Sequence, residues 1–192
     1  MKYLLLFNLI FLCNVATFAD WTINNDASSL SFVTIKNGSV VESHTFKTFS
    51  GSANSQGDIS VEIDLSSTDT QIPIRDERIA NLLFETKIYP KAILKAKLDL
   101  TPLLGMTLGE SAIIQFDAGL NLHGIQAKLP LNVRVTKITA SKMMVSSVKA
   151  LVIDGNDYNL LGGINALRNI AGLKAITQNV PVNFSLIFEQ IL

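Results

Sequence analysis

Strict alternation of apolar and polar residues dominates this chain. In the clearest run, residues 111–122, every second residue is apolar: Ala112, Ile114, Phe116, Ala118, Leu120 and Leu122. The same period recurs along residues 59–65, 92–100, 125–135 and 180–188. A period of two places the apolar side chains on one face of a β-strand and the polar ones on the other. We therefore predict an all-β protein of about eight antiparallel strands, apolar on one face and solvated on the other.

Turn signals between these runs indicate that consecutive strands pair as hairpins. Glycine occurs in the dipeptides Gly57-Asp58, His123-Gly124 and Asp154-Gly155, which suit tight turns. Pro130 and Pro181 fall on polar faces, and because proline has no amide donor we expect them at edges, strand starts or bulges. The pattern alone does not separate a closed barrel from a solid sandwich, since both need the same apolar inner face.

Two segments interrupt the alternation and predict short helices. Between residues 75 and 85 the apolar residues recur at helical spacing, and Asp76 and Glu77 lie near the start, where acids favour the helix dipole. Residues 160–174 show a similar spacing that glycines interrupt. We expect one or two short helices that cover an end of the β structure. For the second segment, a mobile flap is the alternative to an ordinary connection.

The first nineteen residues have the pattern of a secretory signal peptide. Lys2 precedes an apolar run over residues 3–12, and Thr17-Phe18-Ala19 fits a cleavage site after Ala19. The run is too short for a bilayer, which takes ~20 residues. We therefore predict a cleaved signal peptide (residues 1–19), a single domain (residues 20–192), a periplasmic or secreted location and no permanent membrane anchor. A retained anchor and a lipoprotein modified at Cys13 are weaker alternatives.

Composition excludes several classes of function. Cys13 is the only cysteine, so the predicted mature chain has no disulfide, no thiol nucleophile and no thiolate metal ligand. The 16 basic and 16 acidic residues balance, which argues against nucleic acid as a partner. The remaining 173 residues are enough for one domain with a substantial core. A homodimer is left open.

No catalytic motif is visible. The chain has no nucleophile elbow, no phosphate-binding loop, no dinucleotide-binding loop and no His-Glu-x-x-His. With only two histidines, a histidine-based metal site would need both to converge with a carboxylate. An acid–base set could still be assembled from Asp69, Asp76, Glu77 and His123. Helix capping and ion pairs with neighbouring arginines explain these carboxylates better, so we predict no enzyme activity, no cofactor and no metal.

The segment between the strands at 59–65 and 92–100 carries a family resemblance. It contains, in order, Arg75-Asp76-Glu77-Arg78-Ile79, Leu83-Phe84-Glu85 and Tyr89-Pro90-Lys91-Ala92. Further anchors are Trp21, Ser29-Leu30-Ser31-Phe32, the run Phe46-Lys47-Thr48-Phe49-Ser50-Gly51 and the turn Leu120-Asn121-Leu122-His123-Gly124-Ile125. Together they resemble the YceI-like family from about Trp21 to Phe188. Residues 143–176 depart from the family pattern, most clearly along 154–160.

The resemblance implies a lipocalin-like barrel that binds polyisoprenoid lipid in the periplasm. We therefore expect residues 20–192 to hold a long apolar lipid, an isoprenoid of quinone or polyprenyl type, inside the barrel. A solid β-sandwich that binds a partner protein, and an enzyme using the four residues above, are the alternatives. The expected tail-lining residues are Phe32, Ile63, Leu94, Phe116, Leu122, Val133 and Phe184.

The same resemblance implies that Arg75 and Arg78 flank the barrel mouth. A guanidinium group there could hold a pyrophosphate or a quinone oxygen of the lipid head. The alternative is a salt bridge with Asp69, Asp76 or Glu77.

Energetics favour a long ligand. Each buried methylene contributes ~0.8 kcal/mol, so a five-carbon isoprene unit contributes at most roughly 3–4 kcal/mol. Association costs roughly 4–15 kcal/mol, and micromolar affinity requires a further ~8 kcal/mol. About four or more isoprene units must therefore be buried.

Overall fold

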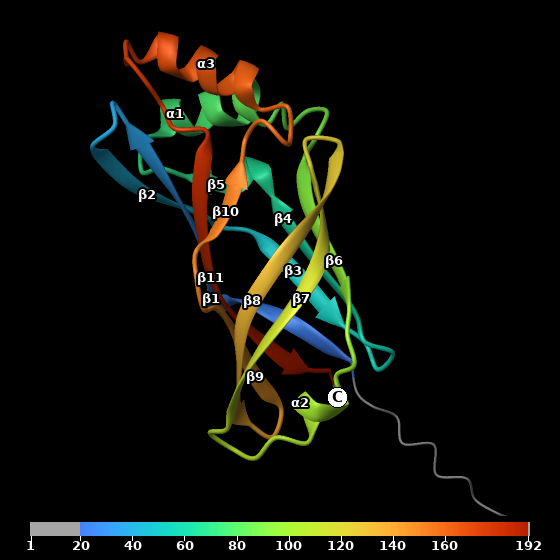
Figure 1. Ribbon diagram of the computed structural model, residues 1–192. Helices are drawn as coiled ribbons and strands as arrows, with labels where there is room; N and C mark the ends of the chain where they lie inside the picture. Colours follow the sequence, from blue (N-terminus) through green and yellow to red (C-terminus); the bar gives the residue numbers. More distant parts are fainter. Residues whose placement is uncertain (1–19, 192) are drawn as a thin grey trace, which may run out of the picture.

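A computed structural model describes residues 20–191 as an eleven-stranded antiparallel sheet with a few short helices (Figure 1). The predicted signal peptide lies outside the described residues. The strands are β1 (Trp21–Lys36), β2 (Val40–Phe46), β3 (Phe49–Ala53), β4 (Asp58–Asp64), β5 (Thr68–Asp69), β6 (Lys91–Lys97), β7 (Ser111–Leu122), β8 (Ile125–Thr139), β9 (Lys142–Ser147), β10 (Leu151–Asp154) and β11 (Asn179–Gln190). The helices are the 3₁₀-helix η1 (Leu65–Ser67), α1 (Pro73–Arg78), the π-helix η2 (Ile79–Leu83), α2 (Thr101–Leu104) and α3 (Leu161–Ile170).

Eight of these strands close into a barrel. The sheet runs in the order β10-β11-β9-β8-β7-β6-β4-β3-β1-β2-β5, and β11 also pairs with β1. That pairing extends from Trp21 opposite Gln190 to Phe32 opposite Val182. The ring therefore consists of β1, β3, β4, β6, β7, β8, β9 and β11, while β2, β5 and β10 extend it at one end. The lipocalin-like barrel is confirmed, and the sandwich alternative is wrong because one hydrogen-bonded ring replaces two separate sheets.

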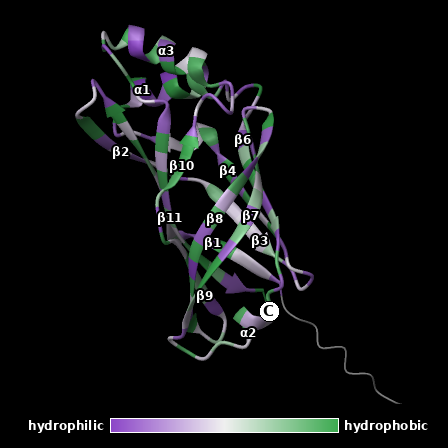
Figure 2. Ribbon diagram, viewed as in Figure 1, coloured by the Kyte–Doolittle hydropathy of each residue, from purple (hydrophilic) through white to green (hydrophobic). Residues whose placement is uncertain are grey.

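The β7–β8 hairpin illustrates how local sequence builds this ring. All twelve residues of β7 are paired with β8, from Ser111 opposite Thr136 to Leu122 opposite Ile125. His123 and Gly124 form its two-residue turn, with φ angles of 53° and 77°, as a type I′ turn requires. Hydrophobic and hydrophilic positions alternate along the strands (Figure 2), so the apolar side chains converge inside the ring.

The two prolines lie where a neighbouring strand has ended. Pro130 pairs with Asp117 on β7, and the pairing of β8 with β9 begins only at Val133. Pro181 pairs with Val152 on β10, beyond the last residue that pairs with β1. A missing amide donor costs little at such positions, so the edge placement is confirmed.

Both predicted helices are present at one end of the barrel (Figure 1). The first, α1 continued by η2, starts at Pro73, a residue favoured in the first helical turn because its missing amide has no helical partner. The second, α3, packs on η2, and a Cβ at Gly163 would lie 2.4 Å from the Leu82 carbonyl oxygen. Gly163 therefore allows the helices to approach closely.

Two strand boundaries differ from the prediction. The alternation through Leu100 predicted a strand to that residue, but β6 ends at Lys97 and Leu100 precedes α2. Pro102 in the first turn of α2 favours this short helix. Likewise β4 ends at Asp64, whose carboxylate accepts a hydrogen bond from the Ser66 amide and starts η1.

Candidate functional site

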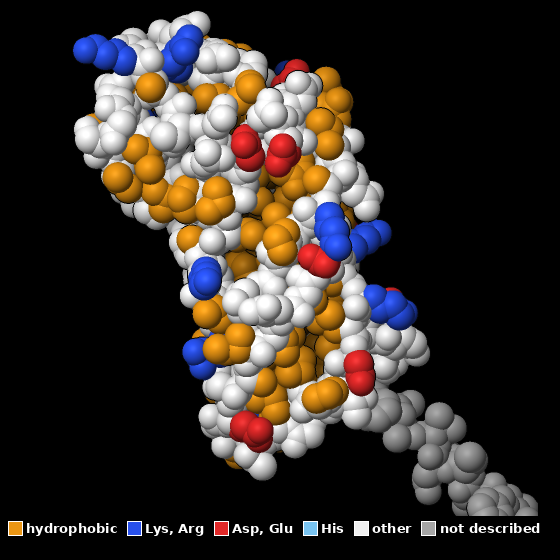
Figure 3. Space-filling model, viewed as in Figure 1, with side chains coloured by type: hydrophobic (Ala, Val, Ile, Leu, Met, Phe, Trp, Pro, Cys, Tyr) orange, Lys and Arg blue, Asp and Glu red, His pale blue; other side chains and the backbone are white. Residues whose placement is uncertain are grey.

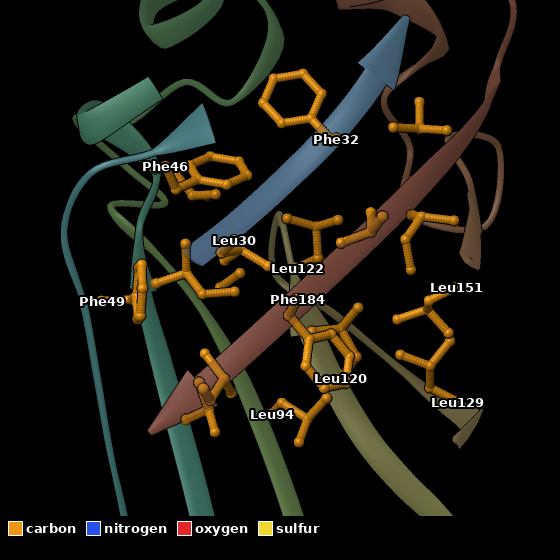
Figure 4. A pocket seen from close by; sticks show the side chains of 18 of the residues that line it. Leu30, Phe32, Phe46, Phe49, Leu94, Leu120, Leu122, Leu129, Leu151 and Phe184 are labelled. Atoms are coloured by element: carbon orange, nitrogen blue, oxygen red, sulfur yellow. The ribbon is translucent and has the colours of Figure 1, made fainter. Parts of the chain in front are cut away.

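The barrel encloses a cavity of about 390 Å³, within the usual range of ligand pockets, roughly 300–1,000 Å³. The inner faces of the strands form its wall, and residues of α1, η2 and α3 line one end. Phe32 on β1, Leu94 on β6 and Phe184 on β11 point into the same space from different sides of the ring (Figure 4). A cavity of this size with such walls suits an apolar ligand.

All seven residues predicted to line a lipid tail lie on the wall of this cavity: Phe32, Ile63, Leu94, Phe116, Leu122, Val133 and Phe184. They come from β1, β4, β6, β7, β8 and β11. The inner-face register deduced from the alternation therefore agrees with the structure. Lipid contact by these residues stays a prediction.

Polar and charged wall residues gather at the end of the barrel that carries α1, η2 and α3, called the helical end below. They are Thr34, Lys36, His44, Arg75, Arg78 and Thr177. They lie on the ends of β1 and β2, on α1 and just before β11. The remaining wall is almost entirely apolar. The cavity is thus a hydrophobic tunnel with one polar end, which suits an amphiphile with a long tail.

Arg75 is held in place by two partners that the sequence did not suggest. Its Nη1 donates to Glu42 Oε2 (2.6 Å), and its Nη2 donates to the Thr70 carbonyl oxygen (2.8 Å). Both ends of the guanidinium fork are therefore engaged, and among the described residues only Nε has no hydrogen-bond partner.

The alternative of a salt bridge between Arg75 and Asp69, Asp76 or Glu77 is wrong, because Arg75 pairs with Glu42. Asp69 instead pairs with Lys47 (2.8 Å), because β2 and β5 run side by side at this point. Asp76 accepts hydrogen bonds from Thr70, including one from its amide (2.8 Å). Glu77 is exposed on α1.

Glu42 anchors a polar cluster that also contains Thr34, Lys36, His44 and Arg75. Hydrogen bonding by Lys36 is the main reason that the pKa of Glu42 lies below its ordinary value, and the charge of Arg75 adds to this effect. Glu42 is therefore ionised at neutral pH and offsets the charges of Lys36 and Arg75. The inner-face period of β2, residues 42, 44 and 46, could have pointed to Glu42 as an inward-facing acid.

His44 is the most buried titratable group of this polar cluster. Its side chain is almost fully buried, and its Nε2 lies 2.9 Å from Thr34 Oγ1. Burial lowers the pKa of His44, and the positive charge of Arg75 lowers it further, so the ring is mainly neutral at pH 7. Within residues 20–191 its Nδ1 has no hydrogen-bond partner.

Arg78 differs from Arg75 because its charge is exposed at the cavity end. It lines the cavity and is solvent-exposed, and no ion pair with it is found within residues 20–191. The two arginines therefore differ in whether their guanidinium groups are already bound to protein groups. Arg75 organises the polar cluster, whereas Arg78 can reach a ligand head group.

The structure does not bring His123 to the proposed acid–base set. His123 is buried at the β7–β8 turn, where its Nε2 lies 2.9 Å from Glu85 Oε2 and its ring packs on Tyr89 with 4.4 Å between centroids. The histidine close enough to act electrostatically on Asp69 and Asp76 is His44. Sequence reasoning therefore selected the wrong histidine.

Residues 20–191 contain neither a metal-binding cluster nor a membrane-spanning helix. No cluster of three or more His, Cys, Asp or Glu side chains in this part of the chain could hold a metal ion. No described helix combines the length and apolar character that crossing a membrane requires.

This architecture is similar to that of known proteins. A family model described as the YceI-like domain matches residues 21–188. The structure of a polyisoprenoid binding domain from Saccharophagus degradans, implicated in plant cell wall breakdown, is 35% identical, with a TM-score of 0.87 over 89% of this chain and 98% of that one.

More distant structures share the fold. Burkholderia cenocepacia BcnA is 20% identical, with a TM-score of 0.62 over 86% of this chain and 98% of that one. The Campylobacter jejuni YceI protein is 14% identical, with a TM-score of 0.57 over 78% of this chain and 85% of that one. No curated protein sequence matches the chain.

Proposed function

Because this chain belongs to the family of YceI-like domain proteins, we propose that it binds a long apolar lipid of the isoprenoid type inside its barrel. The observation that carries this proposal is the cavity. Among the described residues, its wall is apolar except at the end that carries α1, η2 and α3. A solid core would have supported a structural role instead.

The comparison with Saccharophagus degradans supports the isoprenoid class. That protein is described as a polyisoprenoid binding domain and aligns over nearly its whole length with this chain. The energy needed for micromolar binding requires burial of about four or more isoprene units. A long tail along the barrel, in contact with residues such as Leu94, Phe116 and Phe184, meets that requirement.

The head group, of quinone or polyprenyl type, is proposed to lie at the helical end. Arg78 supplies a free guanidinium group there, and a charge-assisted hydrogen bond from it would suit a phosphate or a quinone oxygen. Arg75 contributes mainly by holding Glu42 and the start of α1 in place.

We further propose that the protein acts in the periplasm, without a permanent anchor and without a catalytic role. Cleavage of residues 1–19 would export a domain that begins at Asp20. A binding protein of this kind needs no metal or cofactor, and its partner is the lipid itself.

Lipid extraction and native mass spectrometry of protein purified under mild conditions test this function. We expect a bound species whose mass contains repeated five-carbon units and which disappears when the barrel is unfolded. Protein that carries no lipid, and that takes up no added isoprenoid, would overturn the proposal.

A further inference from the structure

The described wall of the cavity is most exposed to solvent at the end that carries α1 and α3. Among the described wall residues, the solvent-exposed ones are Arg78, Ile170 and Ala171. Arg78 ends α1 and Ile170 ends α3, so the opening lies between these helices. A lipid that enters or leaves the barrel would pass this point.

Three segments surround the opening and are tied to one another. They are residues 36–42 at the tip of the β1–β2 hairpin, residues 72–78 around α1, and residues 161–176, which contain α3 and the loop after it. Asn37 binds the backbone of Lys174 and Ala175 through three hydrogen bonds of 2.8–3.2 Å. Arg75 binds Glu42 at 2.6 Å. We call this surface the mouth face.

The mouth face exposes apolar side chains from all three segments. The large exposed ones are Val40, Val41, Ile72, Ile74 and Ile170. Val41 is 63% exposed, Ile74 is 52% exposed and Ile170 is 49% exposed. Single exposed apolar residues are common on proteins, but apolar residues grouped around a cavity opening indicate an interaction surface.

The charge of the mouth face complements an anionic surface. Its segments contain five basic residues and three acidic ones, an excess of two positive charges, whereas the whole chain is neutral. Two of the acids are engaged: Glu42 with Lys36 and Arg75, and Asp76 with Thr70. Basic and apolar side chains lie next to each other at the α3 end (Figure 3).

We propose that the mouth face docks on an anionic lipid bilayer, with its apolar side chains in the interface and its basic side chains on the lipid phosphates. Interfacial binding of this kind combines buried apolar area with electrostatic attraction. Docking would align the cavity opening with the bilayer, so that a lipid could pass between them without crossing water. This role in lipid transfer, unlike the docking itself, depends on the proposed function.

Flotation with vesicles of phosphatidylcholine, with and without phosphatidylglycerol, tests the docking. We expect the purified protein to float with the anionic vesicles, and to be released by high salt because the attraction is screened. Val41→Asp and Ile74→Asp should each lower the bound fraction roughly tenfold, since each removes one apolar anchor and adds a repelling charge. Lys174→Glu should also weaken binding.

Two matched controls lie away from the mouth face. Leu108→Asp changes an apolar residue that is 68% exposed in the turn after α2, at the opposite end of the barrel (Figure 1). Lys149→Glu changes an exposed basic residue between β9 and β10. Both should float like the unchanged protein, and melting temperatures should show that every variant folds.

The outcomes distinguish failure of the docking proposal from failure of the proposed lipid binding. Protein that carries extracted lipid yet does not float with anionic vesicles would overturn the docking alone. Equal flotation by Ile74→Asp and Leu108→Asp would also overturn it. Flotation as expected by protein that takes up no isoprenoid would keep the docking and reject the proposed function.

Discussion

Leu94→Glu tests most directly whether the barrel interior is the lipid site. Leu94 lies on the inner face of β6, where it pairs with Val61 on β4 and Leu120 on β7, and it lines the cavity. Because Leu94 is partly accessible, loss of its burial should cost about 1 kcal/mol, less than the 1.5–3 kcal/mol of a fully buried leucine. The new carboxyl group faces an apolar wall without a hydrogen-bonding partner, which adds roughly 1–3 kcal/mol.

The expected loss of stability is therefore about 2–4 kcal/mol, or a fall in melting temperature of roughly 4–16 °C for a domain of this size. Lipid binding should suffer more, since a tail that passes residue 94 would contact the carboxyl group. We expect no lipid to co-purify with the Leu94→Glu variant, as measured by extraction and mass spectrometry alongside a thermal melt.

Lys95→Glu is the matched control, because Lys95 lies on the outer face and is exposed. This change should alter stability by no more than about 0.5 kcal/mol and leave lipid content unchanged. If Lys95→Glu were as damaging as Leu94→Glu, the strand register would be wrong by one residue. If Leu94→Glu kept its full lipid content, the cavity would not be the lipid site.

Three further predictions concern the signal peptide, the exposed Arg78 at the cavity end and His44 in the polar cluster. Protein recovered from the periplasm should have an intact mass that begins at Asp20, and full-length chain in the membrane fraction would contradict export. Arg78→Gln should weaken head-group binding about tenfold or more at an almost unchanged melting temperature, because it removes a charge-assisted hydrogen bond at an exposed site; unchanged affinity would leave an apolar tunnel without head-group recognition. The lowered pKa of His44 means that the unfolded chain binds a proton before the folded one as the pH falls, so stability should decrease from about pH 6.5 downward. His44→Phe should flatten this decrease below about pH 6.5, and an unchanged slope in urea titrations would refute the assignment.

The polar cluster shows where sequence reasoning failed. The sequence indicates Arg75 as a candidate site residue, but it suggests the neighbouring carboxylates Asp69, Asp76 and Glu77 as partners. The carboxylate that it binds is Glu42, 33 residues away, because α1 folds back over the end of β2. Only the packing of these two elements decides that pairing. Rules for ion pairs between neighbouring residues of one helix cannot predict a partner on a distant strand.

The sequence by itself determined the strands, their inner faces and the two helices at one end. Backbone geometry explains this, since a period of two can bury only one side of a strand, and residues 111–135 follow it without interruption around the His123-Gly124 turn. The tertiary structure decided what those inner faces enclose. An apolar inner face is the same for a solid core and for a cavity, and the difference depends on closure of the ring between β1 and β11, whose paired residues are separated by most of the chain. Such closure is a property of the whole sheet, so no local pattern could reveal the space of about 390 Å³ or its opening between α1 and α3.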